Sequence, residues 1–207
     1  MLIDYFATNI ISSTIIEHRK EHCDLKSGFA LAYFYFDFND IEKQEVSTFM
    51  SSLIAQLCNQ VVDIPEQLKG LYKRCNNGRQ KATICELKMT LSRIIKDLED
   101  VFIIIDALDE CPKNGERGEL LEFITEIKAW SSSNIHLLVT SRLELDIKET
   151  LTPLLTSQAI SIQGAQVESD IKVHVASQLA IDPRLKRWSS DIKTEIEKTL
   201  TAGANGM

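Results

Sequence analysis

Residues 101–110 read VFIIIDALDE, and this stretch indicates the fold class. An unbroken run of apolar β-formers ends at Asp106, and Asp109 and Glu110 follow three and four positions later. A strand without polar alternation is typical of a parallel sheet that is covered on both faces. We therefore expect residues 101–105 to form a buried strand with carboxylates at its carboxyl end.

A second continuous apolar run, residues 135–139 (IHLLV), leads directly into Thr140, Ser141 and Arg142. Hydrophobic periodicity predicts further strands at 31–38 and 160–162 and helices at 10–22, 43–62, 65–75, 84–98, 119–130, 143–151, 167–180 and 189–200. Thr83 and Glu86 have the spacing of a capping box, and residues 111–118 are expected to form a loop. Apolar strands that alternate with helices indicate an α/β fold with a parallel sheet, here with a helical C-terminal end. Ligands of such folds bind beyond the carboxyl ends of the strands, where both polar clusters lie.

Composition narrows the function classes. The net charge of −7 argues against binding to bulk nucleic acid or to an anionic membrane, because both favour a basic surface. The five cysteines are odd in number and contain no C-x-x-C pair, so a reducing, cytoplasmic location is expected. No apolar run approaches the length of a membrane span.

The two strand-end clusters contain residue types that bind a metal–phosphate ligand. Asp106 can hold Mg²⁺, and Asp109 or Glu110 can orient or deprotonate an attacking water. Thr140 and Arg142 can contact a terminal phosphate, for which the planar guanidinium is well suited. The alternative is a solvated acidic turn beside a surface arginine. The combination of the two clusters favours the ligand site.

Several segments, in this order, resemble one protein family. They are SSTIIEH (12–18), AYFYFDF (32–38), SLIAQLC (52–58), FIIIDALDEC (102–111), NIHLLVTSR (134–142), QVESDIKVHVASQLA (166–180) and AGANGM (202–207). FIIIDALDEC resembles the Walker B segment of NACHT-type STAND nucleotide-binding domains. The chain as a whole is most similar to the fungal, nephrocystin-like N-terminal group of these domains.

The resemblance implies a three-layer P-loop NTPase fold that binds ATP or GTP with Mg²⁺ and works as a signalling switch. By motif, Asp106 would be the magnesium-side carboxylate, and Asp109 with Glu110 would position water. Arg142 would be the sensor arginine, beside Thr140. Residues 1–165 would be a partial nucleotide-binding domain and residues 166–207 the start of a helical extension. The resemblance also implies homo- or hetero-oligomers formed through the nucleotide-binding body.

One part of the family pattern is missing from these 207 residues. The Walker A sequence G-x-x-x-x-G-K-[ST] does not occur, and Gly28 is the first glycine. Thr8 and Asn9 stand roughly where its lysine and hydroxyl residue belong. Without that loop, residues 2–6 (LIDYF) are one candidate for a substitute strand, and neighbouring strands would otherwise have an unpaired edge.

Two functions therefore stay open. The first is a nucleotide switch that is impaired and expected to be inactive as an enzyme, in a shortened copy of the domain. The second is a non-enzymatic interaction or oligomerisation module that has lost nucleotide binding. A metal-dependent hydrolase without a P-loop is a third, weaker alternative, because no further carboxylate or histidine cluster has ligand spacing.

Overall fold

The computed structural model describes residues 5–61, 63–130, 134–155, 159–160, 173, 175–181, 185 and 187–203, without the side chains of 5–11 and 200–203. Its contacts divide the chain into two compact units, Met1–Ile160 and Ser161–Met207. The first unit contains the sheet and both polar clusters. In the second unit, residues 175–181 are helical and α8 spans Ser190–Gly203.

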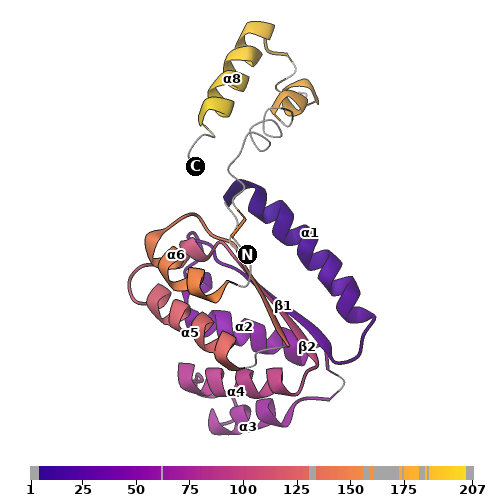
Figure 1. Cartoon of the computed structure of the whole chain (residues 1–207), viewed down its shortest axis with the longest axis vertical. Coiled ribbons are helices and arrows are strands. Elements are labelled where there is room, and N and C mark those ends of the chain that lie inside the picture. The colour runs from indigo at the N-terminus through magenta and orange to yellow at the C-terminus, as the bar shows by residue number, and fades with distance from the viewer. Residues whose placement is uncertain are drawn as a thin grey trace. The chain divides into compact units, whose positions relative to one another are not determined.

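A parallel three-stranded sheet forms the centre of the first unit (Figure 1). Its strands are β1 (Phe29–Tyr35), β2 (Asp100–Asp106) and β3 (Ile135–Val139), in the order β1-β2-β3. Tyr35 pairs with Asp106, and Ile105 pairs with Val139. The carboxyl ends of all three strands therefore lie at the same end of the sheet. The predicted α/β fold with a parallel sheet is confirmed.

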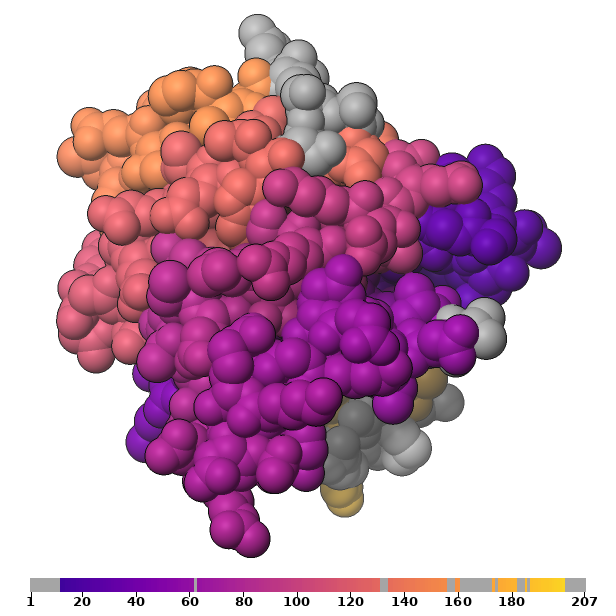
Figure 2. All heavy atoms as spheres, turned by 90° about the horizontal axis from the view of Figure 1, so that it is seen from below, coloured from indigo at the N-terminus to yellow at the C-terminus, as the bar shows by residue number. Residues whose placement is uncertain are grey.

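Helices cover the two faces of the sheet unequally. The helix α1 (Tyr5–Asp24) packs along one face, mainly on β1 and β2. The other face carries α2 (Val46–Cys58), α4 (Ile84–Lys96), α5 (Glu116–Trp130) and α6 (Leu145–Leu151), with α3 (Glu66–Arg74) against α4 (Figure 1). The purple and magenta segment that contains α3 and α4 forms much of the near surface in Figure 2. The short 3₁₀ helices η1 (Ile41–Gln44), η2 (Leu108–Glu110) and η3 (Thr152–Leu154) complete the connections.

Alternate residues of the central strands enter two separate apolar clusters, as expected for a strand that is covered on both faces. Ile103 and Ile105 of β2 join the large cluster with α2, α4 and α5, which we call the core face. Ile104 joins a smaller cluster with Ile16 and Cys23 of α1, which we call the α1 face. The continuous apolar run of β2 thus follows from burial on both sides.

Local capping explains where two of the helices begin. Thr83 and Glu86 form the predicted capping box at the start of α4. At the start of α2, the N-cap residue Glu45 makes no side-chain cap. The carboxylate of Glu116 from α5 accepts the hydrogen bond of the Val46 N–H instead, at 2.9 Å. A side chain from a distant helix thus satisfies a donor that the first turn leaves open.

Some predicted boundaries were wrong. Tyr5 and Phe6 begin α1, so the substitute strand predicted over 2–6 does not form at these two residues, and 2–4 lie outside the described residues. The first strand ends at Tyr35, and Phe38 is 62% exposed in the following loop. Ile160 is not in a strand, and the rest of the strand predicted at 160–162 lies outside the described residues. Within the described residues, no helix is long and apolar enough to cross a membrane.

Glutamine side chains close the outer edge of β1. The amide of Gln60 accepts from the Leu31 N–H at 2.9 Å and donates to the Leu31 carbonyl at 2.7 Å. The amide of Gln56 does the same at Tyr33, at 3.0 and 2.7 Å. Four residues of helix rise about 6 Å and two residues of strand about 6.6 Å, so the spacing of the two amides fits the strand. Both outward-facing residues of this part of β1 are thereby paired.

Candidate functional site

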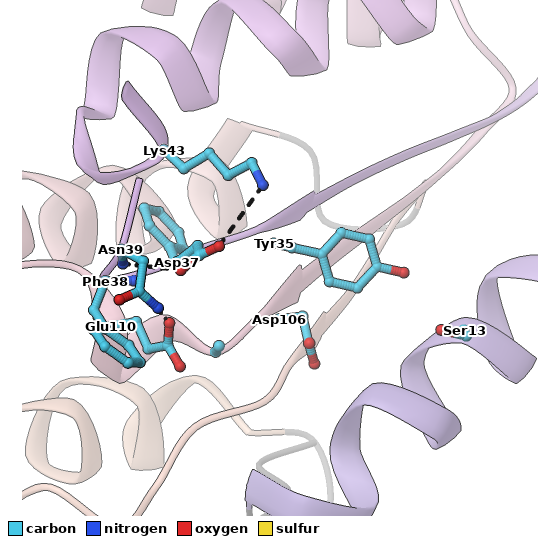
Figure 3. Close-up of a pocket in the computed structure, with 10 residues that line it drawn as sticks. Ser13, Tyr35, Asp37, Phe38, Asn39, Lys43, Asp106 and Glu110 are labelled. Carbon is cyan, nitrogen blue, oxygen red and sulfur yellow. Dashed lines mark hydrogen bonds and ion pairs between the residues drawn. The ribbon is translucent and has the colours of Figure 1, made fainter. Parts of the chain in front are cut away.

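A pocket of about 390 Å³ lies at the carboxyl ends of β1 and β2. Its lining comes from the strand ends, from the loops that follow them and from α1, as Figure 3 shows: Ser13, Tyr35, Phe36, Asp37, Phe38, Asn39, Lys43, Asp106, Ala107 and Glu110. The position agrees with the general rule for open α/β sheets. It is also where the sequence placed the acidic cluster.

Asp106 is the deepest acid of the pocket and is 1% exposed. Its Oδ1 accepts hydrogen bonds from the Ser12 hydroxyl at 2.6 Å and from the Thr140 hydroxyl at 2.5 Å. Its Oδ2 is buried and has no hydrogen-bond partner among the described residues. A carboxylate oxygen without a donor is costly to bury, so this atom is suited to a cationic ligand.

Thr140 connects the ends of β2 and β3. Its hydroxyl donates to Asp106 and accepts from the Ala107 N–H at 3.0 Å, and its carbonyl accepts from the Leu108 N–H at 3.0 Å. These bonds hold Ala107 in the left-handed region, at φ 55° and ψ 46°. A residue other than glycine rarely adopts this conformation, and the surrounding bonds have to impose it. The sharp turn at Ala107 leads directly into η2.

Asp109 and Arg142 form a closed ion pair. The carboxylate of Asp109 accepts from the Arg142 main-chain N–H at 2.9 Å and from its Nε at 2.7 Å. The Asp109 side chain is buried, whereas that of Arg142 is about half exposed. The hydrogen bond to Asp109 raises the pKa of Arg142 above its usual value, against the opposing effect of burial. Both oxygens of Asp109 therefore already hold the arginine that was predicted to contact phosphate.

Glu110 of η2 lies near enough to this ion pair for its charge to contribute to the raised pKa of Arg142. Its Oε2 accepts from the Phe38 N–H at 2.9 Å, which ties η2 to the loop after β1. Lys43 of η1 lines the same pocket and lies within 4.0 Å of Asp37 and 3.8 Å of Asp40 (Figure 3). Among the described residues that line the pocket, Lys43 is the one cationic side chain. Hydrogen bonds thus join the predicted site residues Asp106 with Thr140 and Asp109 with Arg142. The carboxylate of Glu110 bonds to the loop after β1.

Sequence reasoning missed two residues that build the site. Ser12 lies within the quoted SSTIIEH segment, but nothing in that segment indicated a bond to Asp106. Arg117 lies in the predicted loop 111–118 and in fact belongs to α5, where it is 4% exposed. Its guanidinium donates to the carbonyls of Asp109 and Cys111 and to the carboxylate of Glu144. Arg117 therefore holds the η2 segment in place through the main-chain carbonyls of Asp109 and Cys111.

The thiol next to the acidic cluster, Cys111, is not exposed. Cys111 is fully buried, and burial raises the pKa of its thiol to about 12. A thiol with this pKa is almost entirely protonated at neutral pH and is a poor nucleophile and metal ligand. Cys111 is therefore a packing residue.

The donors around Asp106 fit Mg²⁺ better than a metal that needs a protein cage. Among the described residues, no group of three or more histidine, cysteine, aspartate or glutamate side chains is placed to hold a metal ion. Mg²⁺ keeps several of its waters and commonly uses one or two carboxylates together with the phosphates of a substrate. Asp106, with one oxygen free of hydrogen bonds within the described part of the chain, fits that pattern.

The segment that contains the sheet and both polar clusters matches a known family. Residues 8–142 match the family described as "Nephrocystin 3, N-terminal". The chain belongs to this family. The matched segment of the nephrocystin 3 N-terminal family runs from the first turns of α1 to the end of the strand-end sequence after β3, and it includes Ser12, Asp106, Asp109, Thr140 and Arg142. No curated protein matches the chain.

Proposed function

We propose that this member of the nephrocystin 3 N-terminal family is a nucleotide-switch domain of NACHT type with an impaired site. It would bind Mg²⁺ with ATP or GTP weakly and hydrolyse it slowly or not at all. The observation that carries the proposal is the buried Asp106 Oδ2, which has no hydrogen-bond partner among the described residues and belongs to a pocket at the strand ends. A buried acid with an unbonded oxygen does not stabilise the fold through that oxygen, and such an acid in a pocket is a candidate for ligand binding.

The neighbours of Asp106 support the same reading. Ser12 and Thr140 orient its Oδ1 through two short hydrogen bonds, which leaves Oδ2 as the atom that would hold the cation. When bound, Mg²⁺ would neutralise charge on the phosphates. Lys43 lines the pocket and would add a positive charge there, and the 207 residues given contain no Walker A pattern. The net charge of −7 supports a small ligand or a protein partner more than nucleic acid.

Weak binding is expected because of the geometry of α1. The helix is continuous from Tyr5, so Thr8 and Asn9 lie within it, and no glycine precedes Gly28. Most main-chain N–H groups inside a helix are already bonded to carbonyls and do not form an anion-binding nest. The same observation favours the second function, an interaction module that has lost nucleotide binding.

The test is equilibrium binding of fluorescent ATP and GTP analogues to the purified chain, with and without Mg²⁺. We expect saturable binding that Mg²⁺ strengthens. Asp106→Asn should weaken the Mg²⁺-dependent part at least about tenfold, as loss of a group at a metal site does. Asp100→Asn, at the opposite end of the same strand, is the matched control and should bind like the parent chain.

Lys43→Ala tests the phosphate contact, with Lys69→Ala as control because Lys69 makes an exposed ion pair with Glu66 on α3. We expect weaker binding from the first variant alone. If a chain with a native circular dichroism spectrum binds neither nucleotide, the switch proposal is wrong. The interaction module would then be the better account of this chain.

A further inference from the structure

The loop after β1 carries an exposed phenylalanine at the candidate pocket. Phe34 and Phe36 alternate into the core face and are buried, and the same period would bury Phe38 as well. Phe38 instead lies beyond the end of the strand, is 62% exposed and lines the pocket together with Asp106. Its ring therefore contributes little buried surface to the fold.

The main chain at Phe38 forms a tight turn. The Asp40 N–H donates to the Asp37 carbonyl at 3.1 Å, so Phe38 and Asn39 are the central residues of a four-residue turn. Glycine, proline and short polar residues dominate such turns. Asp37 and Asn39 follow this rule, because the Asn39 N–H donates to the Asp37 Oδ1 at 2.9 Å. The turn itself does not require an aromatic side chain at position 38.

Two side chains from other elements hold this turn in place. Oε2 of Glu110 in η2 accepts from the Phe38 N–H at 2.9 Å, and Nε2 of Gln44 in η1 donates to the Phe38 carbonyl at 2.7 Å. The Gln44 amide also donates to the Asp37 carbonyl at 3.3 Å. Both main-chain groups of Phe38 are therefore bonded while its ring is exposed. A side chain on a main chain that is fixed in advance loses less freedom when it contacts a ligand.

The lining of the pocket contains two kinds of chemistry. Figure 3 shows Asp106 between Phe38 and Glu110 on one side and Ser13 on the other. The buried Oδ2 of Asp106 and the ammonium group of Lys43 suit a metal–phosphate group, whereas the exposed ring suits a flat apolar group. A nucleotide carries both groups in one molecule. The volume of about 390 Å³ lies in the range of pockets that hold small ligands.

The other two aromatic residues of the lining are less suited to a flat group. Phe36 is buried in the core face. Tyr35 pairs with Asp106 in the sheet, and its ring lies edge-on to that of Tyr33, with 5.8 Å between the centroids. Tyr35 therefore belongs to the acidic end of the pocket, and Phe38 is the aromatic side chain available at the other end.

We propose that Phe38 is the platform on which the nucleobase stacks, so that the site prefers purine to pyrimidine nucleotides. This inference rests on the proposed nucleotide function and adds the part of the ligand that is selected. Stacking on an aromatic side chain accepts every base, and preferences come from the strength of the stack, which is greater for a two-ring base. ATP and GTP are expected to bind about equally, because stacking does not read the hydrogen-bonding edge of a base.

The first experiment is competition against a ribose-labelled fluorescent ATP analogue bound to the full chain with Mg²⁺. Unlabelled ATP and GTP should compete about equally, and CTP and UTP about three- to tenfold less well. Inorganic tripolyphosphate, which has no base, should compete least. Pyrimidine nucleotides that compete as well as purine nucleotides would overturn the proposal.

Phe38→Ala tests the ring directly. We expect ATP and GTP to bind about tenfold more weakly, tripolyphosphate to bind as it does to the parent chain, and the preference for purines to disappear. Phe38→Trp should keep the preference, and ATP should quench the fluorescence of the added indole. Tyr72→Ala removes another exposed aromatic side chain, on α3, and is the matched control that should change no affinity. All variants should keep the native circular dichroism spectrum.

Asp106→Asn separates this inference from the proposed function. It should weaken ATP, CTP and tripolyphosphate together and leave the ratio of ATP to CTP affinity unchanged, because the acid and the ring contact different parts of the ligand. If the parent chain binds no nucleotide, the proposed function and the stacking role are both wrong. If the parent chain binds nucleotides with Mg²⁺ and Phe38→Ala leaves the ratio of ATP to CTP affinity unchanged, the stacking role alone is wrong.

Discussion

The two faces of the sheet are built for different tasks. Most of the buried apolar side chains of the described residues lie on the core face, under α2, α4 and α5. The α1 face buries far fewer, namely Ile16, Cys23, Leu31 and Ile104. Its margin is partly polar, with Arg19 over the Phe102 ring at 4.9 Å and His136 stacked on the same ring. The core face therefore supplies most of the hydrophobic stabilisation.

The α1 face nevertheless contributes to the candidate site. Through Ser12, α1 donates a hydrogen bond to the buried carboxylate of Asp106, and Ser13 of the same helix lines the pocket. A helix held by few apolar contacts opens at lower free energy than one in the main core. The difference suggests that stability and ligand response are placed on opposite sides of one sheet. Four measurements test this difference between the two faces.

The largest effect is expected on the core face. Phe49 of α2 is fully buried, and its ring lies 5.3 Å from the Phe34 ring and 5.9 Å from the Phe123 ring. Phe49→Ala would leave a cavity among these rings and lower the free energy of unfolding by about 4 kcal/mol. Urea denaturation, followed by tryptophan fluorescence, measures this change in the free energy of unfolding. A loss below about 2 kcal/mol would show that the core face relaxes as easily as the α1 face.

Each face contains a buried cysteine that can report its opening, Cys23 on the α1 face and Cys111 on the core face. Burial raises the pKa of Cys23 on the α1 face and raises that of Cys111 on the core face to about 12. A raised pKa keeps the thiol protonated, so labelling of both increases with pH and requires local opening. At pH 8 we expect Cys111 to be labelled at least about a hundredfold more slowly than Cys23.

Thiol labelling with mass spectrometry gives both rates in one sample, and the exposed Cys85 is the control for reagent activity. Equal rates for Cys23 and Cys111 would mean that the faces open together, and the comparison of the two faces would fail.

A deletion on the α1 face should cost less than the one on the core face. Ile16 is 7% exposed and packs in the small cluster with Leu31 and Ile104. Ile16→Ala should lower the free energy of unfolding by about 2 kcal/mol, because the open margin of this face can collapse around the lost atoms. Urea denaturation of this variant beside Phe49→Ala gives the ratio. A loss equal to that of Phe49→Ala would remove the difference between the faces.

The smallest effect has the opposite sign. Asp106→Asn removes a buried charge whose Oδ2 lacks a hydrogen-bond partner in the described residues, while the amide oxygen can still accept from Ser12 and Thr140. We expect the free energy of unfolding to rise by about 1 kcal/mol in Mg²⁺-free buffer. Thermal unfolding with and without Mg²⁺ checks this. A destabilised variant would mean that Asp106 is a structural acid.

The two strands that precede the polar clusters were the most predictable part of the fold. A run such as IHLLV contains no competing period, so its boundaries at 135 and 139 were predicted correctly, and the Thr83–Glu86 spacing predicted a real cap. The meeting of Asp106 with Thr140 followed from the parallel order, because adjacent strand ends lie together. These features depend on local pattern and on one topological rule.

Contacts between elements that are far apart in the chain were not predictable. Ser12 reaches Asp106 only because α1 crosses the sheet at that position, and periodicity does not fix where a helix crosses. Arg117 was not predicted as a site residue because it lies in the predicted loop 111–118. A charged residue beside glycines indicates a surface loop, and the sequence does not show that Asp109 and Glu144 are its partners. The ion pair between Asp109 and Arg142 was also missed, because both were assigned separately to a ligand.

The amide pairs on β1 have a consequence for how the chain folds. A glutamine amide carries the same kinds of hydrogen-bonding group as a peptide unit. Gln56 of α2 and Gln60, two residues beyond the end of α2, therefore satisfy Tyr33 and Leu31 as a neighbouring strand would. Unlike a proline or a charge within the strand, this protection exists only after α2 has docked. A folding intermediate with β1 formed and α2 loose would expose an aromatic-rich edge to other chains. Aggregation is therefore expected during refolding at high protein concentration and not from the native state.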